Sequence, residues 1–445
     1  MKADDENADL FAQRGGILLA NLVIDGKPAE IMIGTDGRIA AAGEGIRRSC
    51  RSDAEFIIDC NRCIALPGFV NTHTHAAMTL LRGYADDMPL QEWLTAKIWP
   101  LEAHLTGEDV FWGTRLACLE MIRSGTTAFN DMYFFMEDAA RAVAESGIRA
   151  CLSYGFIDLQ DADRRERECR ATENFVATIA GMRNSRIQAG VGPHAVYTVS
   201  AEGLRWLGEF ARGKNIRIHV HLSETEQEVR DCIVQHGVRP PALLDSCGCL
   251  TPMTIAAHCC WLSRTESHLL GTRGVSVSHN PVSNMKLAVS RALPYHWLRK
   301  DGVRVTLGTD GAASNNSLDL LETMKFAALL QKYAWKNQTL APAHEVLDMA
   351  TRNGALALGT GSGTIAAGAP ADIILINPRT PCNTPLHNLS SNLVYSCSGS
   401  AVETVLCDGK VLMLERAVPG EEKILEGATR AASALLDRTR GDGAG

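Results

Sequence analysis

The sequence has no long run of charges of one sign and no apolar run long enough to cross a membrane. Its 44 basic and 51 acidic residues are mixed along the chain and give a net charge of -7. This balance argues against nucleic acid and against an anionic membrane surface as the main partner. Residues 1–16 are acidic and contain no apolar core of a signal peptide. We therefore predict a soluble, cytoplasmic protein that binds neither nucleic acid nor membranes.

The cysteines do not form the pattern of a disulfide-rich protein. All 14 are scattered over 445 residues, and two of them, Cys259 and Cys260, are adjacent. Secreted disulfide scaffolds are short and dense in cysteine, because the bridges replace a small core. We expect reduced and mostly buried thiols.

The order of predicted elements indicates one large barrel with an appendage. Short strands joined by turns are predicted before residue 66 and again after residue 367. Between them, short apolar strands alternate with helices, which is typical of parallel β/α units. The predicted barrel strands are 67–73, 125–131, 149–156, 187–194, 216–223, 254–259, 275–280 and 304–310, and predicted helices include 108–125, 201–214, 318–334 and 342–359.

These elements predict an α/β fold with a (β/α)8 barrel. We assign residues 67–366 to the barrel. Both ends of the chain are rich in predicted strands, so we expect 1–66 and 367–445 to pair into one small β-sandwich, with a terminal helix.

Polar residues close most of the predicted barrel strands. The C-terminal strand ends of such a barrel build its active site, so these side chains are expected to converge in space. The strand-end residues are His73, His75, Asp131, His194, His221, His258, His279 and Asp310.

The first of these pairs, His73 and His75, is spaced for metal binding. Side chains alternate along a strand, so both imidazoles point to one side and can share a metal ion. The spacing alone is a weak signal, since His219 and His221 repeat it within the same chain. The alternative is a pair of strand-end histidines that hydrogen-bond to the backbone.

Four motifs resemble the amidohydrolase superfamily, and within it the 5'-methylthioadenosine and S-adenosylhomocysteine deaminases, which include 5'-deoxyadenosine deaminases. The resemblance covers nearly the whole chain and implies a barrel with a β-sandwich formed from both termini. The motifs are PGFVNTHTH, HVHLSETEQE, AHCCWL and LGTDGAASNNSLDL. The implied reaction is the metal-dependent hydrolytic deamination of 5'-modified adenosines to inosines and ammonia.

The resemblance places the metal ligands at His73, His75, His221 and Asp310. Three imidazoles and one carboxylate suit zinc, with iron as the alternative, and leave one position for water. We take His221 as the ligand because the family's His-x-x-Glu spacing follows it, and place His219 in the core or behind the ligands. Relatives with two metals carry a lysine after the fourth strand, and 187–200 contains none, so one metal ion is expected.

The resemblance also assigns catalytic roles to three residues. Glu224 would protonate the ring nitrogen beside the carbon under attack, and Asp310 would take the proton of the water. His258 would hydrogen-bond the attacking oxygen. Structural alternatives are a solvated Glu224 in the first turn of a helix and an Asp310 that caps a helix.

Substrate contacts are carried over to Trp93, Glu102, His194 and Ser314, besides Glu224 and Asp310. A carboxylate at Glu102 accepts hydrogen bonds from both vicinal hydroxyls of a ribose. The alternatives are a core Trp93 and a surface Glu102. The implied partner is a small nucleoside, and no nucleic acid or membrane is expected.

The part of the site beyond the 5' carbon is defined less well. Arg170 is the candidate to pair with the carboxylate of a homocysteine tail. Some relatives have a second arginine where this chain has Tyr154, which leaves 5'-methylthioadenosine and 5'-deoxyadenosine open as substrates. The nearby Arg164, Arg165 and Arg167 alternate with acids, as on a solvated face.

Two other functions stay open at this point. One is an aminohydrolase of the same superfamily that acts on guanine, cytosine or a triazine. Such an enzyme needs no carboxylate to bind a sugar diol, so a diol-binding role of Glu102 would argue against this function. A non-catalytic scaffold protein on this fold would be expected to lose ligands, and this chain keeps them all. We also expect a homo-oligomer, as is common for soluble enzymes.

Overall fold

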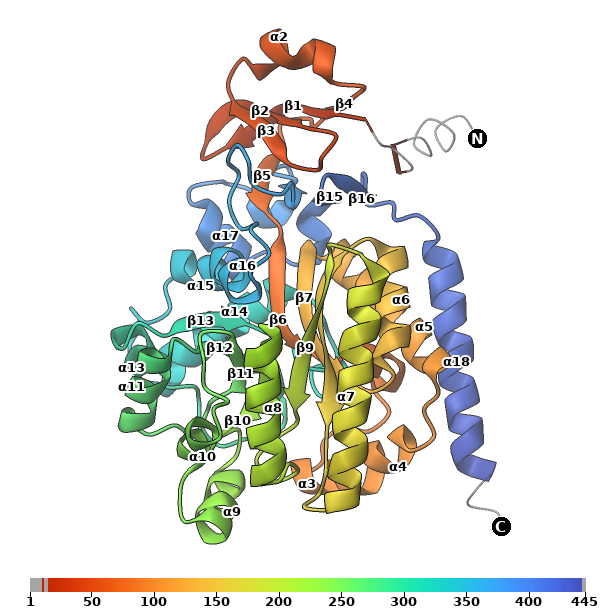
Figure 1. Cartoon of the computed structure of the whole chain (residues 1–445). Helices are drawn as coiled ribbons and strands as arrows, with labels where there is room; N and C mark the ends of the chain where they lie inside the picture. The colour runs from red at the N-terminus through yellow and green to blue at the C-terminus, as the bar shows by residue number, and fades with distance from the viewer. Residues whose placement is uncertain (1–9, 12–14, 442–445) are drawn as a thin grey trace.

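The computed structural model describes residues 10–11 and 15–441, so the acidic start of the chain lies largely outside it. Eight parallel strands follow one another around a near-closed barrel in chain order (Figure 1). They are β6 (Phe69–Thr74), β7 (Thr126–Tyr133), β8 (Arg149–Phe156), β9 (Ile187–Pro193), β10 (Arg217–Leu222), β11 (Thr254–His258), β12 (Ser276–His279) and β13 (Arg304–Leu307). The predicted α/β barrel is confirmed.

The first and last barrel strands meet without a regular ladder. The backbone N–H of Asp310 donates to the carbonyl of His73 at 3.0 Å, and the Thr72 hydroxyl donates to the carbonyl of Leu307 at 2.9 Å. The barrel therefore closes where His73 and Asp310, two predicted metal ligands, come together.

Helices cover the outside of the barrel (Figure 1). Their ends follow local signals: Thr106 and Asp109 form a capping box at the start of α5, and Gly147 ends α6 with a φ of 81°. The helices are α5 (Gly107–Arg123), α6 (Met136–Ser146), α7 (Ala162–Met182), α8 (Ala201–Lys214), α9 (Glu226–His236), α10 (Pro240–Ser246), α11 (Arg264–Arg273), α12 (Pro281–Lys286), α13 (Tyr295–Lys300), α14 (Leu320–Ala334), α15 (Ala343–Ala350) and α16 (Arg352–Leu358).

The prediction of one helix over 342–359 is wrong. The chain breaks at Thr351, with φ -121° and ψ -93°, and forms α15 and α16 instead. The Thr351 hydroxyl donates to the carbonyl of Leu347, which gives the backbone a local alternative to helix continuation. The segment after His75 forms a 3-10 helix over Ala76–Leu81.

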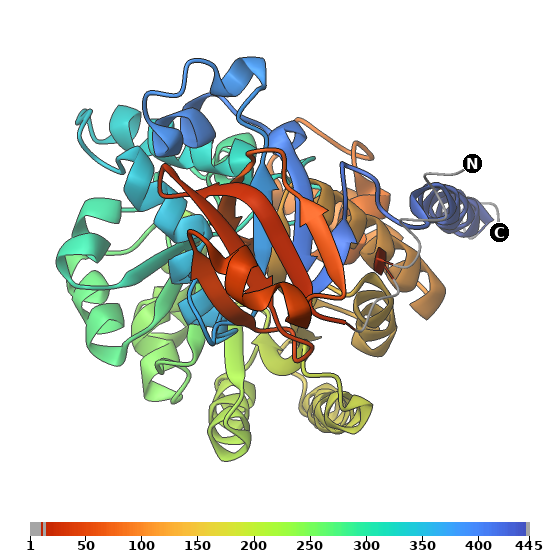
Figure 2. The same ribbon diagram turned by 90° about the horizontal axis from the view of Figure 1, so that it is seen from above.

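Both ends of the chain contribute to a second, mixed sheet, which confirms the predicted shared β domain. The link between the ends is the antiparallel pairing of β5 with β14. Viewed from above, this sheet lies across one end of the barrel (Figure 2). Its strands are β1 (Ile17–Ile24), β2 (Lys27–Ile33), β3 (Ile39–Gly43), β4 (Phe56–Asp59), β5 (Ile64–Pro67), β14 (Ile373–Ile376), β15 (Val402–Cys407) and β16 (Lys410–Met413).

The small sheet covers the N-terminal ends of the barrel strands, because β5 leads directly into β6. The exact domain bounds of 66 and 366 stay predictions. The predicted terminal helix is α18 (Glu421–Gly441), which runs along the barrel beside α5 (Figure 1). None of the helices in the described part of the chain is both long enough and apolar enough to span a bilayer.

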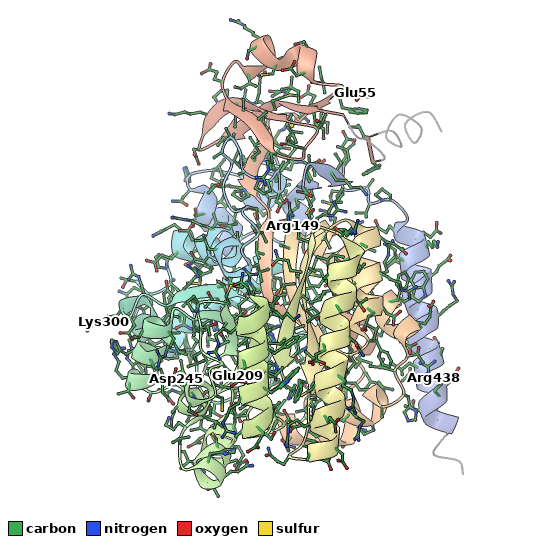
Figure 3. All side chains as sticks on the ribbon, viewed as in Figure 1. Glu55, Arg149, Glu209, Asp245, Lys300 and Arg438 are labelled. Carbon is green, nitrogen blue, oxygen red and sulfur yellow. The ribbon has the colours of Figure 1, made fainter. Side chains whose placement is uncertain are left out.

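An ionic contact ties the barrel to the small sheet. Arg149, at the start of β8, lies between the two (Figure 3). Its Nε donates to Asp372 at 2.8 Å and its NH2 group donates to Asp408 at 2.5 Å. The Asp372 side chain is fully buried, so the guanidinium neutralises a carboxylate that has no access to water.

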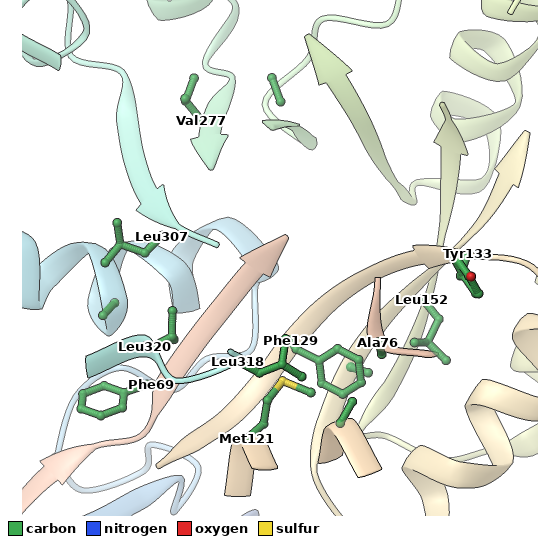
Figure 4. Close-up of a cluster of buried hydrophobic side chains, with 14 of the residues drawn as sticks. Phe69, Ala76, Met121, Phe129, Tyr133, Leu152, Val277, Leu307, Leu318 and Leu320 are labelled. Carbon is green, nitrogen blue, oxygen red and sulfur yellow. The ribbon is translucent and has the colours of Figure 1, made fainter. Parts of the chain in front are cut away.

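Two kinds of side chain fill the barrel region. Apolar groups such as Phe69, Phe129 and Leu152 are fully buried and pack together with helix residues such as Met121 (Figure 4). Inside the barrel, by contrast, Thr72 and its neighbours form a buried polar layer in which hydroxyls satisfy one another at 2.7 to 2.8 Å. This polar layer adjoins the strand ends that carry the histidines.

Candidate active site

Four predicted metal ligands converge at the C-terminal end of the barrel. His73 lies on β6 and His75 directly follows it, His221 lies on β10, and Asp310 comes from the segment after β13. Oδ1 of Asp310 lies 3.3 Å from Nε2 of both His73 and His75. Nε2 of His75 lies 3.2 Å from Nε2 of His221. Residues from three distant parts of the chain therefore surround one point.

The outer nitrogen of each histidine is engaged away from this point. Nδ1 of His75 donates to the carbonyl of Met132, and Nδ1 of His221 donates to the carbonyl of His194, both at 2.7 Å. Nδ1 of His73 lies 2.7 Å from Nε2 of His219, which is fully buried behind it. His219 thus supports a predicted ligand from behind, as expected of a second layer around a metal.

This arrangement fits a cation. Burial lowers the pKa of His73 to about 4 and the pKa of His221 well below its usual range, so both rings are neutral. The Nδ1 atoms of His75 and His221 donate to carbonyls, which leaves the Nε2 lone pairs of these two rings facing inward, 3.2 Å apart and unable to hydrogen-bond each other. Nε2 of His73 is buried without a hydrogen-bond partner. A divalent ion would bind these lone pairs together.

Asp310 is held in an unusual backbone conformation, with a φ of 63°. Its Oδ1 accepts from the N–H of Gly311 at 2.8 Å and its Oδ2 accepts from the Ser283 hydroxyl at 2.6 Å. Burial alone would raise the pKa of Asp310, but the nearby imidazoles, His73 first, hold it well below its usual range. It does not cap a helix: the N-cap of the following helix, α14, is Asp319.

Glu224 follows β10 and faces the metal ligands. It is 9% exposed and precedes helix α9, whose N-cap is Thr225, so it is not a solvated helix residue. Burial raises the pKa of Glu224 to about 8, and the negative charge of Asp310 adds to that rise. Glu228 accepts from the N–H of Glu224 at 2.7 Å and fixes this loop. A carboxyl group whose pKa is raised in this way can hold a proton at neutral pH and give it away.

His258 ends β11 beside Glu224, with Nδ1 3.6 Å from Oε1 of that carboxyl group. It is 1% exposed, and burial lowers its pKa to about 4. One of its ring nitrogens also lies within 4.8 Å of ligand atoms of His73 and Asp310. The neutral ring is therefore placed to act on a group bound at the metal ligands.

A cavity opens over these residues. Glu102 and Tyr133 line its wall, and the Tyr133 hydroxyl donates to Oε1 of Glu102 at 2.7 Å. Burial raises the pKa of Glu102 to about 7. The cavity is thus lined by a third carboxyl group, Glu102, besides those of Glu224 and Asp310.

The structure brings most of the predicted substrate residues to this cavity. Trp93, Glu102, His194 and Ser314 all line it. Trp93 is 5% exposed, and its indole N–H donates to the carbonyl of Ala85 at 2.9 Å, so its ring is held in place. The alternative of Glu102 as a surface charge is therefore excluded, because its side chain lines the cavity.

Arg170 is not brought to the cavity. It lies on α7 with a side chain that is 59% exposed, and it pairs with Glu166 one turn earlier at 2.6 Å. Tyr154 also does not line the cavity, because alternation along β8 turns it toward Glu168 on α7. The expectation that Arg170 pairs with the carboxylate of a homocysteine tail rested on the resemblance, and the geometry gives it no support.

Some cavity residues were not predicted from the sequence. Tyr133 and Tyr197 both line the cavity. The predicted strand ended at Asp131, whereas β7 continues for two more residues to Tyr133. A longer predicted strand would have placed Tyr133 at the strand end, where site residues are expected. Asp131 itself does not line the cavity, and its Oδ1 instead accepts from the N–H of Ala76 at 2.9 Å.

Three imidazoles and a carboxylate gathered at the C-terminal ends of parallel barrel strands are a donor set typical of metal-dependent hydrolases. The chain belongs to the amidohydrolase family, whose family model matches residues 64–412. The resemblance in the four sequence motifs is thereby confirmed.

Curated relatives and solved structures narrow the class. The chain is 63% identical to a 5'-deoxyadenosine deaminase of Methanoregula boonei, over 98% of both chains. It is 47% identical to a 5-methylthioadenosine/S-adenosylhomocysteine deaminase of Archaeoglobus fulgidus, over 97% of this chain and 98% of the relative. An adenosine deaminase of Xanthomonas campestris, solved with bound zinc, superposes with a TM-score of 0.86 at 33% identity, covering 96% and 98% of the two chains.

Proposed function

We propose that this chain catalyses the hydrolytic deamination of adenosines modified at the 5' carbon, giving the corresponding inosines and ammonia. The substrates are 5'-deoxyadenosine, 5'-methylthioadenosine, S-adenosylhomocysteine and adenosine. One observation carries the proposal: a cavity that holds the carboxyl group of Glu224 beside the metal ligands and that of Glu102 on its wall. The names of the relatives support the same reaction.

The proposed cofactor is one divalent metal ion, zinc, held by His73, His75, His221 and Asp310. The inward Nε2 lone pairs support this assignment, as does the zinc in the Xanthomonas relative. Iron is the alternative, because the same donors bind it. When bound, such an ion lowers the pKa of a water to about 7 and so makes a nucleophile available at neutral pH.

The chain's own residues then move the protons. Glu224, protonated at neutral pH because its pKa is raised to about 8, donates to the purine nitrogen beside C6. Asp310 is ionised and accepts the proton of the attacking water. His258 hydrogen-bonds to the attacking oxygen and stabilises the charge that develops there. Proton return to the amino group lets ammonia leave.

The remaining cavity residues hold the nucleoside. The Glu102 carboxylate, oriented by Tyr133, accepts hydrogen bonds from the two ribose hydroxyls. Trp93 forms a fixed aromatic wall, and His194 and Ser314 offer polar groups to the sugar and the purine. Nucleobases without a sugar offer no hydroxyl to Glu102 and leave it with Tyr133 as its hydrogen-bond donor, which disfavours the alternative of a guanine, cytosine or triazine aminohydrolase.

The lining of the cavity also bears on the 5' substituent. Among the described residues that line it, there is no lysine or arginine, and apolar side chains such as Leu94, Trp99 and Ile157 contribute to its walls. A homocysteine carboxylate would find no cation there. We therefore rank 5'-deoxyadenosine and 5'-methylthioadenosine above S-adenosylhomocysteine.

Ammonia release from zinc-loaded enzyme tests the proposal. The panel is adenosine, 5'-deoxyadenosine, 5'-methylthioadenosine, S-adenosylhomocysteine, guanine and cytosine, with the loss of adenine absorbance followed in parallel. We expect the 5'-modified adenosines to show the highest kcat/KM. Turnover of free bases alone would overturn the assignment, beginning with Glu102.

We also propose that the enzyme acts in the cytoplasm as a homo-oligomer. All 14 cysteines are free thiols and most of them are buried, which suits a reducing compartment. The oligomer rests on the general frequency of symmetric assemblies among soluble enzymes. Light scattering of the purified protein measures its mass directly.

A further inference from the structure

The orientation of the His258 ring depends on two buried amides. Nδ1 of His258 lies 2.8 Å from Nδ2 of Asn284 and 3.3 Å from Nδ2 of Asn280. Both asparagines come from the stretch that follows β12, and they are 4% and 0% exposed. An amide NH2 group can only donate, so Nδ1 of the neutral imidazole must accept.

The direction of the Asn284 amide is set by a third buried residue. Oδ1 of Asn284 lies 3.3 Å from the Sγ atom of Cys260, which is fully buried. A thiol is a donor and only a weak acceptor, so the S–H of Cys260 favours the amide oxygen on its side and directs the NH2 group at His258. The hydrogen bonds therefore run from Cys260 through Asn284 to His258.

The carboxyl group of Glu224 does not compete for this nitrogen. Its Oε1 lies 3.6 Å from Nδ1, beyond the range of a hydrogen bond, whereas the Asn284 contact is at 2.8 Å. With Nδ1 accepting, the single ring proton of His258 is on Nε2. Nε2 is then the nitrogen left to face the reaction centre.

We propose that Asn284 is a positioning residue that holds His258 as the Nε2–H tautomer, a donor toward the attacking oxygen, and that Cys260 orients the Asn284 amide. The proposal deepens the proposed deaminase function and rests on it for the role of His258. The tautomer itself is a property of the folded, metal-loaded chain.

This tautomer decides between two possible sets of metal ligands. The side chains at the site group both as His73, His75 and His221 and as His73, His258 and Asp310. An imidazole nitrogen that carries a proton has no lone pair for a metal. His258 is therefore a hydrogen-bond donor beside the metal and not one of its ligands.

The sharpest test is Asn284→Asp, which keeps the shape and replaces the donor by a carboxylate. The carboxylate accepts from Nδ1–H, so the ring proton moves and the Nε2 lone pair faces the site. We expect kcat for 5'-deoxyadenosine to fall about 100-fold with KM nearly unchanged. Two-bond proton–nitrogen correlation spectra of zinc-loaded, 15N-histidine-labelled enzyme should show the His258 signals change from the Nε2–H to the Nδ1–H pattern.

Two controls separate this role from a general loss of structure. Asn383→Asp makes the same change at a fully buried asparagine far from the site, whose NH2 group donates to the carbonyl of Asn377 at 2.9 Å. It should leave the His258 signals and KM unchanged even where stability falls. Cys260→Ser keeps a donor and should retain most of the wild-type kcat, whereas Cys260→Ala should lower it.

The outcome is decided by the spectra as well as by turnover. An Nδ1–H signal for His258 in the wild-type enzyme overturns the proposal, and so does wild-type kcat in Asn284→Asp. If no nucleoside is deaminated at all, the proposed function fails. The tautomer of His258 is then still tested by the nitrogen spectra of the wild-type enzyme and of Asn284→Asp, with the metal content of each variant measured alongside.

Discussion

The Tyr133 hydroxyl donates to Glu102 at 2.7 Å inside the cavity, and burial raises the pKa of Glu102 to about 7. Only the ionised carboxylate accepts hydrogen bonds from both hydroxyls of a ribose. The ionised fraction grows as the pH rises through 7. We therefore expect KM for 5'-deoxyadenosine to fall between pH 6 and pH 8.

The matched control is Glu102→Gln, in which this pH dependence of KM should disappear while KM is high at every pH. A 2',3'-dideoxy analogue should likewise show little change of KM with pH. A flat KM in the wild-type enzyme over this range contradicts the role of Glu102 as acceptor for the diol.

Glu224→Gln removes the proton that the purine nitrogen receives but keeps the size of the side chain. General acid catalysis contributes about 100-fold or more, so kcat should fall by at least that factor with metal content and melting temperature retained. Glu226→Gln, two residues along on the exposed start of α9, is the control and should leave kcat unchanged. Wild-type kcat in Glu224→Gln would show that another group supplies the proton.

Removal of the metal tests the inward-facing imidazoles. Dialysis against a chelator should abolish activity, and one equivalent of zinc per chain should restore it. The metal should also stabilise the fold, by about 4 kcal/mol when free zinc is 1,000 times its Kd. His221→Ala should lose the metal and His387→Ala, an exposed histidine, should not. Binding of two tight equivalents would contradict the assignment of a single site.

Arg149→Leu should destabilise the protein strongly. The substitution leaves the fully buried carboxylate of Asp372 without its cation, and breaking such a pair costs about 3–5 kcal/mol. Arg170→Ala breaks an exposed pair with Glu166 and should cost less than about 1 kcal/mol. Denaturant unfolding of both variants gives the comparison, and equal losses would show that Arg149 is not a structural tie.

The same Arg170→Ala variant tests the reading of the 5' substituent. Since Arg170 lies outside the cavity, kcat/KM for S-adenosylhomocysteine relative to 5'-deoxyadenosine should not change. A selective loss with S-adenosylhomocysteine would mean that the α7 surface takes part in binding the homocysteine tail.

The strands and the convergence of the histidines could be predicted because both follow from local periodicity. Alternation places His73 and His75 on one side, and parallel strands end at one face of the barrel. The Thr351 break could not be predicted, because the sequence on either side is helical and a local side-chain hydrogen bond decides the outcome. The position of Arg170 outside the cavity could not be predicted either, because its pairing with Glu166 on the exposed side of the same helix is seen only in the structure.

Contacts between side chains of separate segments could not be predicted for a different reason. Asn284 and Cys260 are 24 positions apart, and nothing in their own segments indicates that they touch beside His258. Tyr133 and Glu102 meet in the same way. Such pairs depend on how separate segments pack over the strand ends, and one sequence carries no periodic signal for that.

The pairing of β5 with β14 has a consequence for biosynthesis. Pro67 pairs with Ile373, so the small sheet joins segments made about 300 residues apart. At roughly 5–20 residues per second, a ribosome needs about 15–60 s to make the stretch between them. During that time β1 to β5 lack their partner β14, so the edge of β5 stays unpaired while all eight barrel strands are synthesised. The barrel can therefore close before the sheet that covers its base, and the last strands to emerge complete the first ones.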